Sequence, residues 1–142
     1  MRTAEWVNRG LPLLLVAMIG VVVWLNAGRQ EAPAQAVVCT DLSKGCAARI
    51  AGREVRFGTD TAIKPLKAFE VWVQAPGAQQ IEARFTMEGM DMGFNLYTLR
   101  TDDQGVHKAR ITLPVCVSGR RDWVMTLDID GTDLAVPFVT DL

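Results

Sequence analysis

The sequence contains very little histidine and none of the short motifs of the common enzyme classes. His107 is the single histidine among 142 residues. Hydrolytic triads and catalytic zinc sites depend on histidine, and a blue-copper centre requires two histidines beside a cysteine. The chain also lacks a Cys-x-x-Cys pair, a nucleophile elbow and a phosphate-binding glycine loop. We therefore expect a protein that is neither an enzyme nor a blue-copper carrier.

An excess of positive charge is also missing. Lys and Arg number 15 against 16 Asp and Glu, a formal net charge of -1, and the two signs are interspersed along the chain. Nucleic-acid-binding domains gather their basic residues into a stripe or patch. The sequence therefore predicts no nucleic-acid partner, and its length leaves room for one folded domain.

The amino-terminal region differs from the rest by a long apolar run. Arg2 and Arg9 precede an uncharged segment over residues 10–28, which is the pattern of an export signal. Trp6 and Trp24 lie 18 positions apart, a span of about 27 Å on a helix that matches two interfacial aromatic anchors. These features favour a membrane span that is retained.

Three parts of the chain follow from this interpretation. Residues 1–28 are predicted to be a transmembrane signal anchor, residues 29–36 a polar linker and residues 37–142 a folded domain. Basic residues that precede a span mark its cytoplasmic side. The sequence thus predicts a single-pass protein of the bacterial inner membrane with its carboxy-terminal domain in the periplasm. The small residues Ala34-Gln35-Ala36 leave cleavage of the signal as the alternative.

Three cysteines in an exported domain predict one disulfide and one odd thiol. Cys39 and Cys46 are separated by six residues that include Gly45, so a bridge between them is easy to close. A loop of this size contributes about 2 to 3 kcal/mol in the chain-entropy account. Cys116 then remains as a candidate metal ligand or redox thiol. A bridge from Cys116 to one of the other two cysteines stays open as the alternative.

Beyond position 37 the apolar residues recur with a period of two, which is typical of strands with one buried face. Asp130-Gly131 is the strongest of several turn signals that separate these runs. The expected strands cover residues 49–51, 54–57, 68–74, 80–87, 95–101, 107–115, 123–129 and 134–140. About seven short antiparallel strands predict an all-β domain, an immunoglobulin-like or cupredoxin-like β-sandwich.

Half of the six methionines lie within one short segment. Met87, Met90 and Met92 fall in the sequence Met-Glu-Gly-Met-Asp-Met-Gly. Thioether and thiolate sulfurs are the ligands that Cu(I) prefers. In a sandwich this segment lies at one end, and the turn that contains Cys116 can reach the same end. We therefore predict a Cu(I) site formed by Met87, Met90, Met92 and Cys116, suited to copper trafficking.

Methionine also has structural uses. Met87 shares the parity of Ile81, Ala83 and Phe85, so it fits the buried face of a strand equally well. Methionines also form adaptable contact surfaces for partner proteins. His107 stays outside the predicted ligand set, because a lone strand histidine is more often structural.

A resemblance to a known family strengthens the copper hypothesis. The segments Met87–Gly93, Leu113–Arg120 and Asp122-Trp123 look like those of a set of uncharacterised proteobacterial membrane proteins. The chain resembles the FixH and YtkA-like group, small bacterial proteins with an amino-terminal span and a β-sandwich, over residues 65–139. The resemblance implies copper handling in respiratory oxidase assembly, beside an oxidase subunit or a copper chaperone. PCuAC-type chaperone domains place histidines with their methionines, and this segment has none.

The sequence thus predicts a membrane-anchored periplasmic Cu(I)-binding protein, resembling a metallochaperone, that assists cytochrome oxidase assembly or copper trafficking. Two alternatives stay open. One is a non-metal accessory or assembly subunit of a respiratory membrane complex, with the Met segment as its contact surface. The other is a thiol–disulfide redox protein that uses Cys116 with another cysteine.

Overall fold

The computed structural model describes residues 14–25, 34–87, 90 and 95–140. The chain divides into two compact units, residues 1–32 and 33–142. The first unit contains a helix over residues 14–25. Within the described residues, no helix is both long enough and apolar enough to cross a membrane. Residues 1–13 and 26–28 of the predicted anchor lie outside the described part of the chain.

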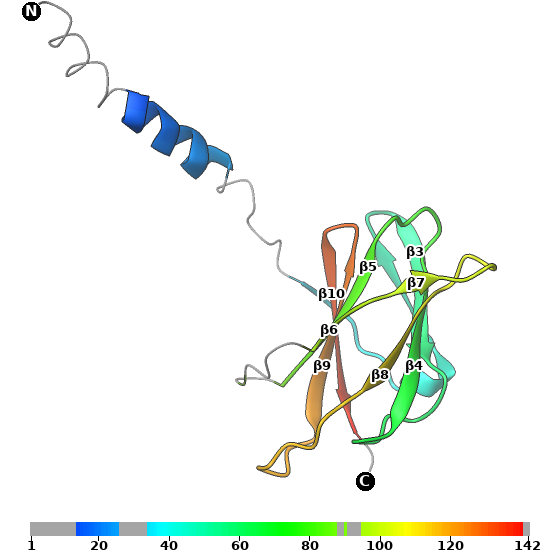
Figure 1. Ribbon diagram of the computed structural model, residues 1–142. Coiled ribbons are helices and arrows are strands. Elements are labelled where there is room, and N and C mark those ends of the chain that lie inside the picture. The colour runs from blue at the N-terminus through cyan, green and yellow to red at the C-terminus, as the bar shows by residue number, and fades with distance from the viewer. Residues whose placement is uncertain (1–13, 26–33, 88–89, 91–94, 141–142) are drawn as a thin grey trace, which may run out of the picture. The chain divides into compact units, whose positions relative to one another are not determined.

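The second unit is built from two five-stranded sheets (Figure 1). The first sheet has the order β1 (Gln35–Ala36), β10 (Thr132–Val139), β9 (Asp122–Ile129), β5 (Ile81–Thr86) and β6 (Leu96–Thr98). The second has the order β2 (Cys46–Ile50), β3 (Arg53–Thr59), β4 (Ala68–Gln74), β8 (His107–Thr112) and β7 (Arg100–Thr101). A short 3-10 turn, η1 (Leu42–Lys44), precedes β2. The predicted all-β sandwich is confirmed.

One apolar core fills the space between the sheets, and period-two alternation produces it. In β9 every second residue is buried, namely Trp123, Met125, Leu127 and Ile129. In β5, Ile81, Ala83 and Phe85 are completely buried. The ring of Phe85 meets Phe69 of the second sheet edge-on, at a centroid distance of 6.2 Å. The predicted inward faces of these strands are therefore correct.

Two tight hairpins fix the register of the strands beside them. Ala51-Gly52 connects β2 to β3 and Asp130-Gly131 connects β9 to β10. Both residues of each pair have positive φ, 48° and 79° in the first and 51° and 85° in the second. Two successive left-handed residues match the right-handed twist of the flanking strands. The hairpin predicted at Asp130-Gly131 is confirmed.

The predicted strand over residues 95–101 is wrong in one respect, because it is two strands. β6 pairs with β5 in the first sheet, whereas β7 pairs with β8 in the second. Leu99 lies between them, 4% exposed, and its N–H donates to the carbonyl of Ile81. The side chains keep their alternation across this crossing. The pattern of apolar residues therefore gives no sign that the chain changes sheets.

Several boundaries also differ from the prediction, among them those of β1, β2 and β8. β1 lies inside the predicted linker, where it pairs in parallel with Leu134 and Ala135 of β10. β2 begins at Cys46 rather than at position 49, and β8 ends at Thr112 rather than at position 115. Hydrogen bonds to a neighbouring strand define the end of a strand, so the apolar pattern does not locate it: Leu113 is completely buried but lies beyond β8.

The strand directions bring three loops to one end of the sandwich, which we call the Met end. It carries the β3–β4 loop (60–67), the described residues of the β5–β6 loop (Met87, Met90 and Asn95) and the β8–β9 loop (113–121). The C-terminal end of β10 lies here too, at the lower end of the sandwich in Figure 1. The hairpins at 51–52 and 130–131 and the loops 75–80 and 102–106 form the opposite end.

Candidate sulfur site at the Met end

Met87 follows β5 and continues its buried face. It is 2% exposed and belongs to the same core cluster as Phe85. The interpretation of Met87 as a core residue is therefore correct. One member of the predicted ligand set, Met87, therefore packs its side chain against the interior of the sandwich.

Met90 lies directly opposite Met87. The two residues form an isolated antiparallel bridge, and the Met90 N–H donates to the Met87 carbonyl at 3.0 Å. Residues opposed in this way carry their side chains on the same face, with Cβ atoms about 5 Å apart. Met90 is 38% exposed. The bridge therefore pairs one buried thioether with one that solvent reaches, while Met92 lies outside the described residues.

Cys116 is the free thiol of the β8–β9 loop. It is buried, 7% exposed, and its Sγ lies 2.9 Å from the Ser118 hydroxyl. A tight turn surrounds it, because the Gly119 N–H donates to the Cys116 carbonyl at 3.0 Å. The Ser118 hydroxyl lowers the pKa of the Cys116 thiol below its usual 9.0, and the positive charge of Arg120 contributes the least of the causes. A lowered pKa enriches the thiolate, which is the form that binds soft metals.

The fold brings Met87, Met90 and Cys116 to the same end of the domain. Met87 and Cys116 are members of one continuous core cluster. Thr86 pairs with Val124 near the start of β9, and the loop of Cys116 leads directly into that strand. Among the described His, Cys, Asp and Glu residues, no three lie close enough together to hold a metal ion.

The other two cysteines form the predicted disulfide. Cys39 and Cys46 are bonded, with their Cα atoms 5.9 Å apart. This bridge closes the segment that contains η1 and joins it to the first residue of β2. The alternative pairings of Cys116 are not found.

His107 lies away from these sulfurs. It begins β8 beside the 102–106 loop, at the opposite end of the sandwich. Its side chain is buried, and Nδ1 has no hydrogen-bond partner within the described structure. The geometry gives it no part in a site at the Met end.

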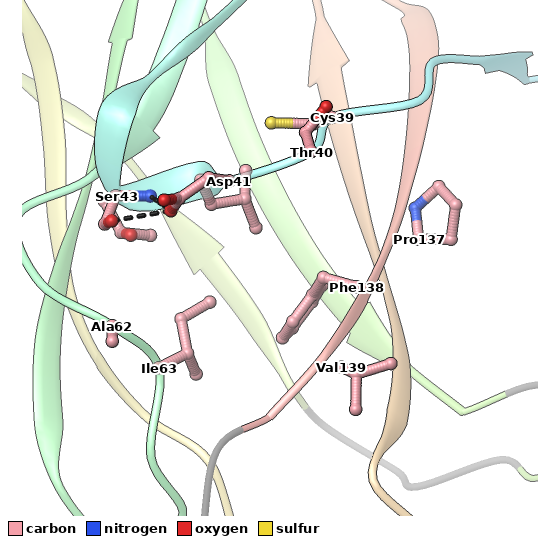
Figure 2. A pocket seen from close by; sticks show the side chains of 11 residues that line it. Cys39, Thr40, Asp41, Ser43, Ala62, Ile63, Pro137, Phe138 and Val139 are labelled. Atoms are coloured by element: carbon pink, nitrogen blue, oxygen red, sulfur yellow. Dashed lines mark hydrogen bonds between the residues drawn. The ribbon is translucent and has the colours of Figure 1, made fainter.

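A cavity of about 570 Å³ lies beside the disulfide segment (Figure 2). Its apolar wall includes Ile63 and Phe138, and Asp41 lies at its rim. The Asp41 carboxylate accepts from the Ser43 N–H at 3.0 Å and from the Ser43 hydroxyl at 2.6 Å. Cys39 also lines the cavity, but its sulfur is in the disulfide. The cavity thus offers oxygen groups and no free thiol, so it is unsuited to Cu(I).

This cavity could not be predicted from the sequence, because its lining comes from three separate segments. These are residues 39–43, residues 59–63 and the end of β10. The methionines were singled out because they cluster in the sequence, and Cys116 because it is the odd cysteine.

No protein family, characterised protein or solved structure matches the chain.

Proposed function

We propose that the protein is a membrane-anchored periplasmic Cu(I)-binding protein of the metallochaperone type. Copper is its cargo, passed on in cytochrome oxidase assembly or copper trafficking. The observation that carries the proposal is the Met87–Met90 bridge, which sets two thioethers opposite each other at the edge of the core. The resemblance to the FixH and YtkA-like group and an immunoglobulin-like or cupredoxin-like arrangement belong to the same proposal.

The donor set suits a soft ion. Neutral thioethers with one thiolate favour Cu(I) over harder ions such as Zn²⁺ or Mg²⁺. Met90 and Met92 are the proposed entry ligands, since Met90 is partly exposed. Met87 and Cys116 are proposed as the inner ligands, since both are buried. The lowered pKa of Cys116 favours the anionic ligand that a Cu(I) site of this kind needs.

The test is a Cu(I) titration against a competing chelator. Residues 34–142 serve as the sample, because the whole core cluster lies between Leu42 and Val136. The proposal expects one Cu(I) per domain, bound tightly by the wild type and lost in the Met90→Leu/Met92→Leu variant. Cys116→Ser should weaken binding without abolishing it.

Met125→Leu is the matched control. Met125 is a completely buried methionine of β9, and leucine conserves its volume. This variant should bind Cu(I) as the wild type does. Failure of the folded wild type to compete for Cu(I) would refute the proposal. Equal losses in the control and the double variant would show that the Met segment has no special role.

The thiol–disulfide alternative makes a different prediction. Alkylation of Cys116 would abolish a redox activity, whereas the Met90→Leu/Met92→Leu variant would keep it. The formed Cys39–Cys46 bridge leaves Cys116 without a second free thiol in the domain. A redox role would therefore require an intermolecular disulfide between Cys116 and a partner protein. Trapping of such a disulfide by the wild type but not by a variant mutated at Cys116 alone would distinguish the redox alternative from copper binding.

A further inference from the structure

Exposed aliphatic side chains gather at the Met end of the sandwich. Seven large apolar residues of the described β-domain are exposed, and six of them lie in the loops of this end or in strand residues at it. The six are Leu66, Met90, Leu96, Val115, Val117 and Val139. The seventh is Val38, in the segment before the disulfide. The described loops of the opposite end expose none.

Two of the loops at the Met end are joined by a backbone hydrogen bond. The Leu66 N–H donates to the Leu113 carbonyl at 2.9 Å, which ties the β3–β4 loop to the β8–β9 loop. Val117 follows Cys116 at the apex of its turn and is fully exposed, at 104%. We call Leu66, Val115 and Val117, with the charged residues of their two loops, the loop-tip surface.

Leu66 is held in an unusual backbone conformation. Its φ is 59°, in the left-handed region that a leucine rarely adopts, and its side chain is 69% exposed. The exposed Leu66 side chain adds no packing to the core that would offset its backbone strain. Such outliers persist at functional positions more often than elsewhere.

The charges of the two loops are predominantly positive. They hold four basic residues against one acidic residue, a net of +3: Lys64, Lys67, Arg120, Arg121 and Asp60. Arg120 forms an ion pair with Asp122, the first residue of β9, so the net charge with this carboxylate included is +2. The loops of the opposite end hold three acidic residues and no basic residue, a net of -3: Asp102, Asp103 and Asp130. The β5–β6 loop adds Glu88 and Asp91, which lie outside the described residues. The loop-tip surface itself therefore combines aliphatic tips with basic side chains.

We propose that the loop-tip surface docks onto an anionic lipid bilayer. Val117 and Leu66 project from separate loop tips, and a protein partner would need a matching pocket for each. A bilayer accepts convex apolar tips without a preformed pocket, and its anionic headgroups attract the neighbouring Lys and Arg side chains. The orientation would hold the Met end against the membrane. This inference goes beyond copper binding and does not require it.

Vesicle sedimentation of the domain tests the proposal. Residues 34–142 are used because the apolar amino-terminal segment would bind vesicles by itself. The vesicles contain either phosphatidylcholine alone or equal parts of phosphatidylcholine and phosphatidylglycerol. We expect binding to the anionic vesicles, weakened by salt, and far less binding to the neutral ones.

Variants of exposed residues locate the contact. Val117→Asp should reduce binding at least about ten-fold, because it removes a valine that the bilayer would bury and adds a charge that the anionic headgroups repel. Arg121→Ser should reduce it about five-fold, the effect of one basic residue near an anionic surface. Val38→Asp is the matched control, since Val38 is 90% exposed and lies outside the surface. It should bind as the wild type does, and all variants should keep the wild-type circular dichroism.

Three results would overturn the proposal. One is a folded wild-type domain that fails to bind anionic vesicles. Another is an equal loss in Val117→Asp and Val38→Asp. The third concerns the full chain in its native membrane: a photo-crosslinking residue placed at position 117 that labels a discrete protein and no lipid would assign the surface to a protein partner.

Discussion

The chain passes unusually close to itself at Gly58 of β3. A Cβ atom at this position would lie 2.7 Å from the Leu42 carbonyl oxygen, 2.8 Å from Cζ2 of Trp72 and 2.9 Å from the Gly45 Cα. Two of these three atoms belong to the backbone of the turn that the disulfide closes. Gly58→Ala must therefore displace that turn as well as the Trp72 ring.

The expected cost follows from these contacts. Inserting a methyl group into a packed site costs about 1 to 3 kcal/mol. Replacing glycine by alanine recovers about 0.4 to 1 kcal/mol through the unfolded chain, which is too little to offset a backbone displacement. We expect Gly58→Ala to lower the free energy of unfolding by about 2 kcal/mol and the midpoint temperature by about 8 °C for a domain of this size.

The disulfide should determine how much of this cost appears. Removing it by Cys39→Ser/Cys46→Ser, across a sequence separation of 7, should cost about 2.4 kcal/mol by loop entropy. Without the bridge the turn above Gly58 can move away from an added methyl group. The triple variant should therefore lose at least about 0.5 kcal/mol less than the sum of the two effects.

Urea denaturation of residues 34–142, followed by tryptophan fluorescence, measures the free energy of unfolding of the wild type, of Gly58→Ala, of the disulfide-free variant and of the triple variant. The reasoning fails if the free energy of unfolding of Gly58→Ala lies within about 0.5 kcal/mol of the wild-type value, because the close contacts at position 58 would then relax without cost. Strict additivity with the disulfide would also refute it. In that case the strain would not be held by the bridge.

Three further predictions concern exposed features of the domain. Backbone N–H groups of the β4–β5 loop hold the pKa of Asp130 below its usual 3.8. The carboxylate therefore stabilises the fold above pH 3.8, and this contribution is lost as the pH falls through the lower pKa of the folded state. Asp130→Asn should make the free energy of unfolding, measured by denaturation at a series of pH values, fall less steeply on the acid side. Ser118→Ala should raise the pKa of Cys116, seen as a shift of the alkylation-rate profile to higher pH, and an unchanged profile would contradict the assigned cause. Pro137 lies on the part of the β10 edge that β1 leaves uncovered, and as a proline it offers no N–H to a further strand. Pro137→Thr should therefore promote self-association, measured by gel filtration. A strictly monomeric variant would show that the edge is protected by other means.

Most of the strands can be identified from the sequence because apolar side chains recur at every second position on their buried faces. Trp123, Met125 and Leu127 alternate with polar residues, so one face of β9 follows directly from the period. β1 could not be predicted. It has two exposed residues, Gln35 and Ala36, whose strand character comes only from their pairing with β10.

The change of sheet at Leu99 was also beyond the sequence. The residue is buried like its neighbours in the pattern, and only the partner of the backbone changes there. Which strand a segment pairs with is a long-range property, whereas periodicity is local. For this reason the inward faces of most strands and the sandwich architecture were predictable, but the number of strands and the sheet to which each segment belongs were not.

The candidate site was predictable to a different degree for each sulfur. Clustering in the sequence drew attention to Met87 and Met90, and a sandwich topology was enough to bring Cys116 to the same end. The burial of Met87 was an open alternative that the structure decides. The opposition of Met87 and Met90 depends on backbone hydrogen bonding, which the spacing alone does not specify.

The position of Cys116 links the sulfur site to the loop-tip surface and gives a last prediction. Cys116 lies between Val115 and Val117, which are 54% and 104% exposed. Docking that buries both valines in a bilayer would also cover the thiol between them. Alkylation of Cys116 by a charged maleimide should therefore slow when anionic vesicles are added and recover at high salt. An unchanged rate, under conditions where sedimentation shows the domain to be bound, would mean that the β8–β9 loop faces away from the lipid. The membrane contact would then have to lie elsewhere on the domain.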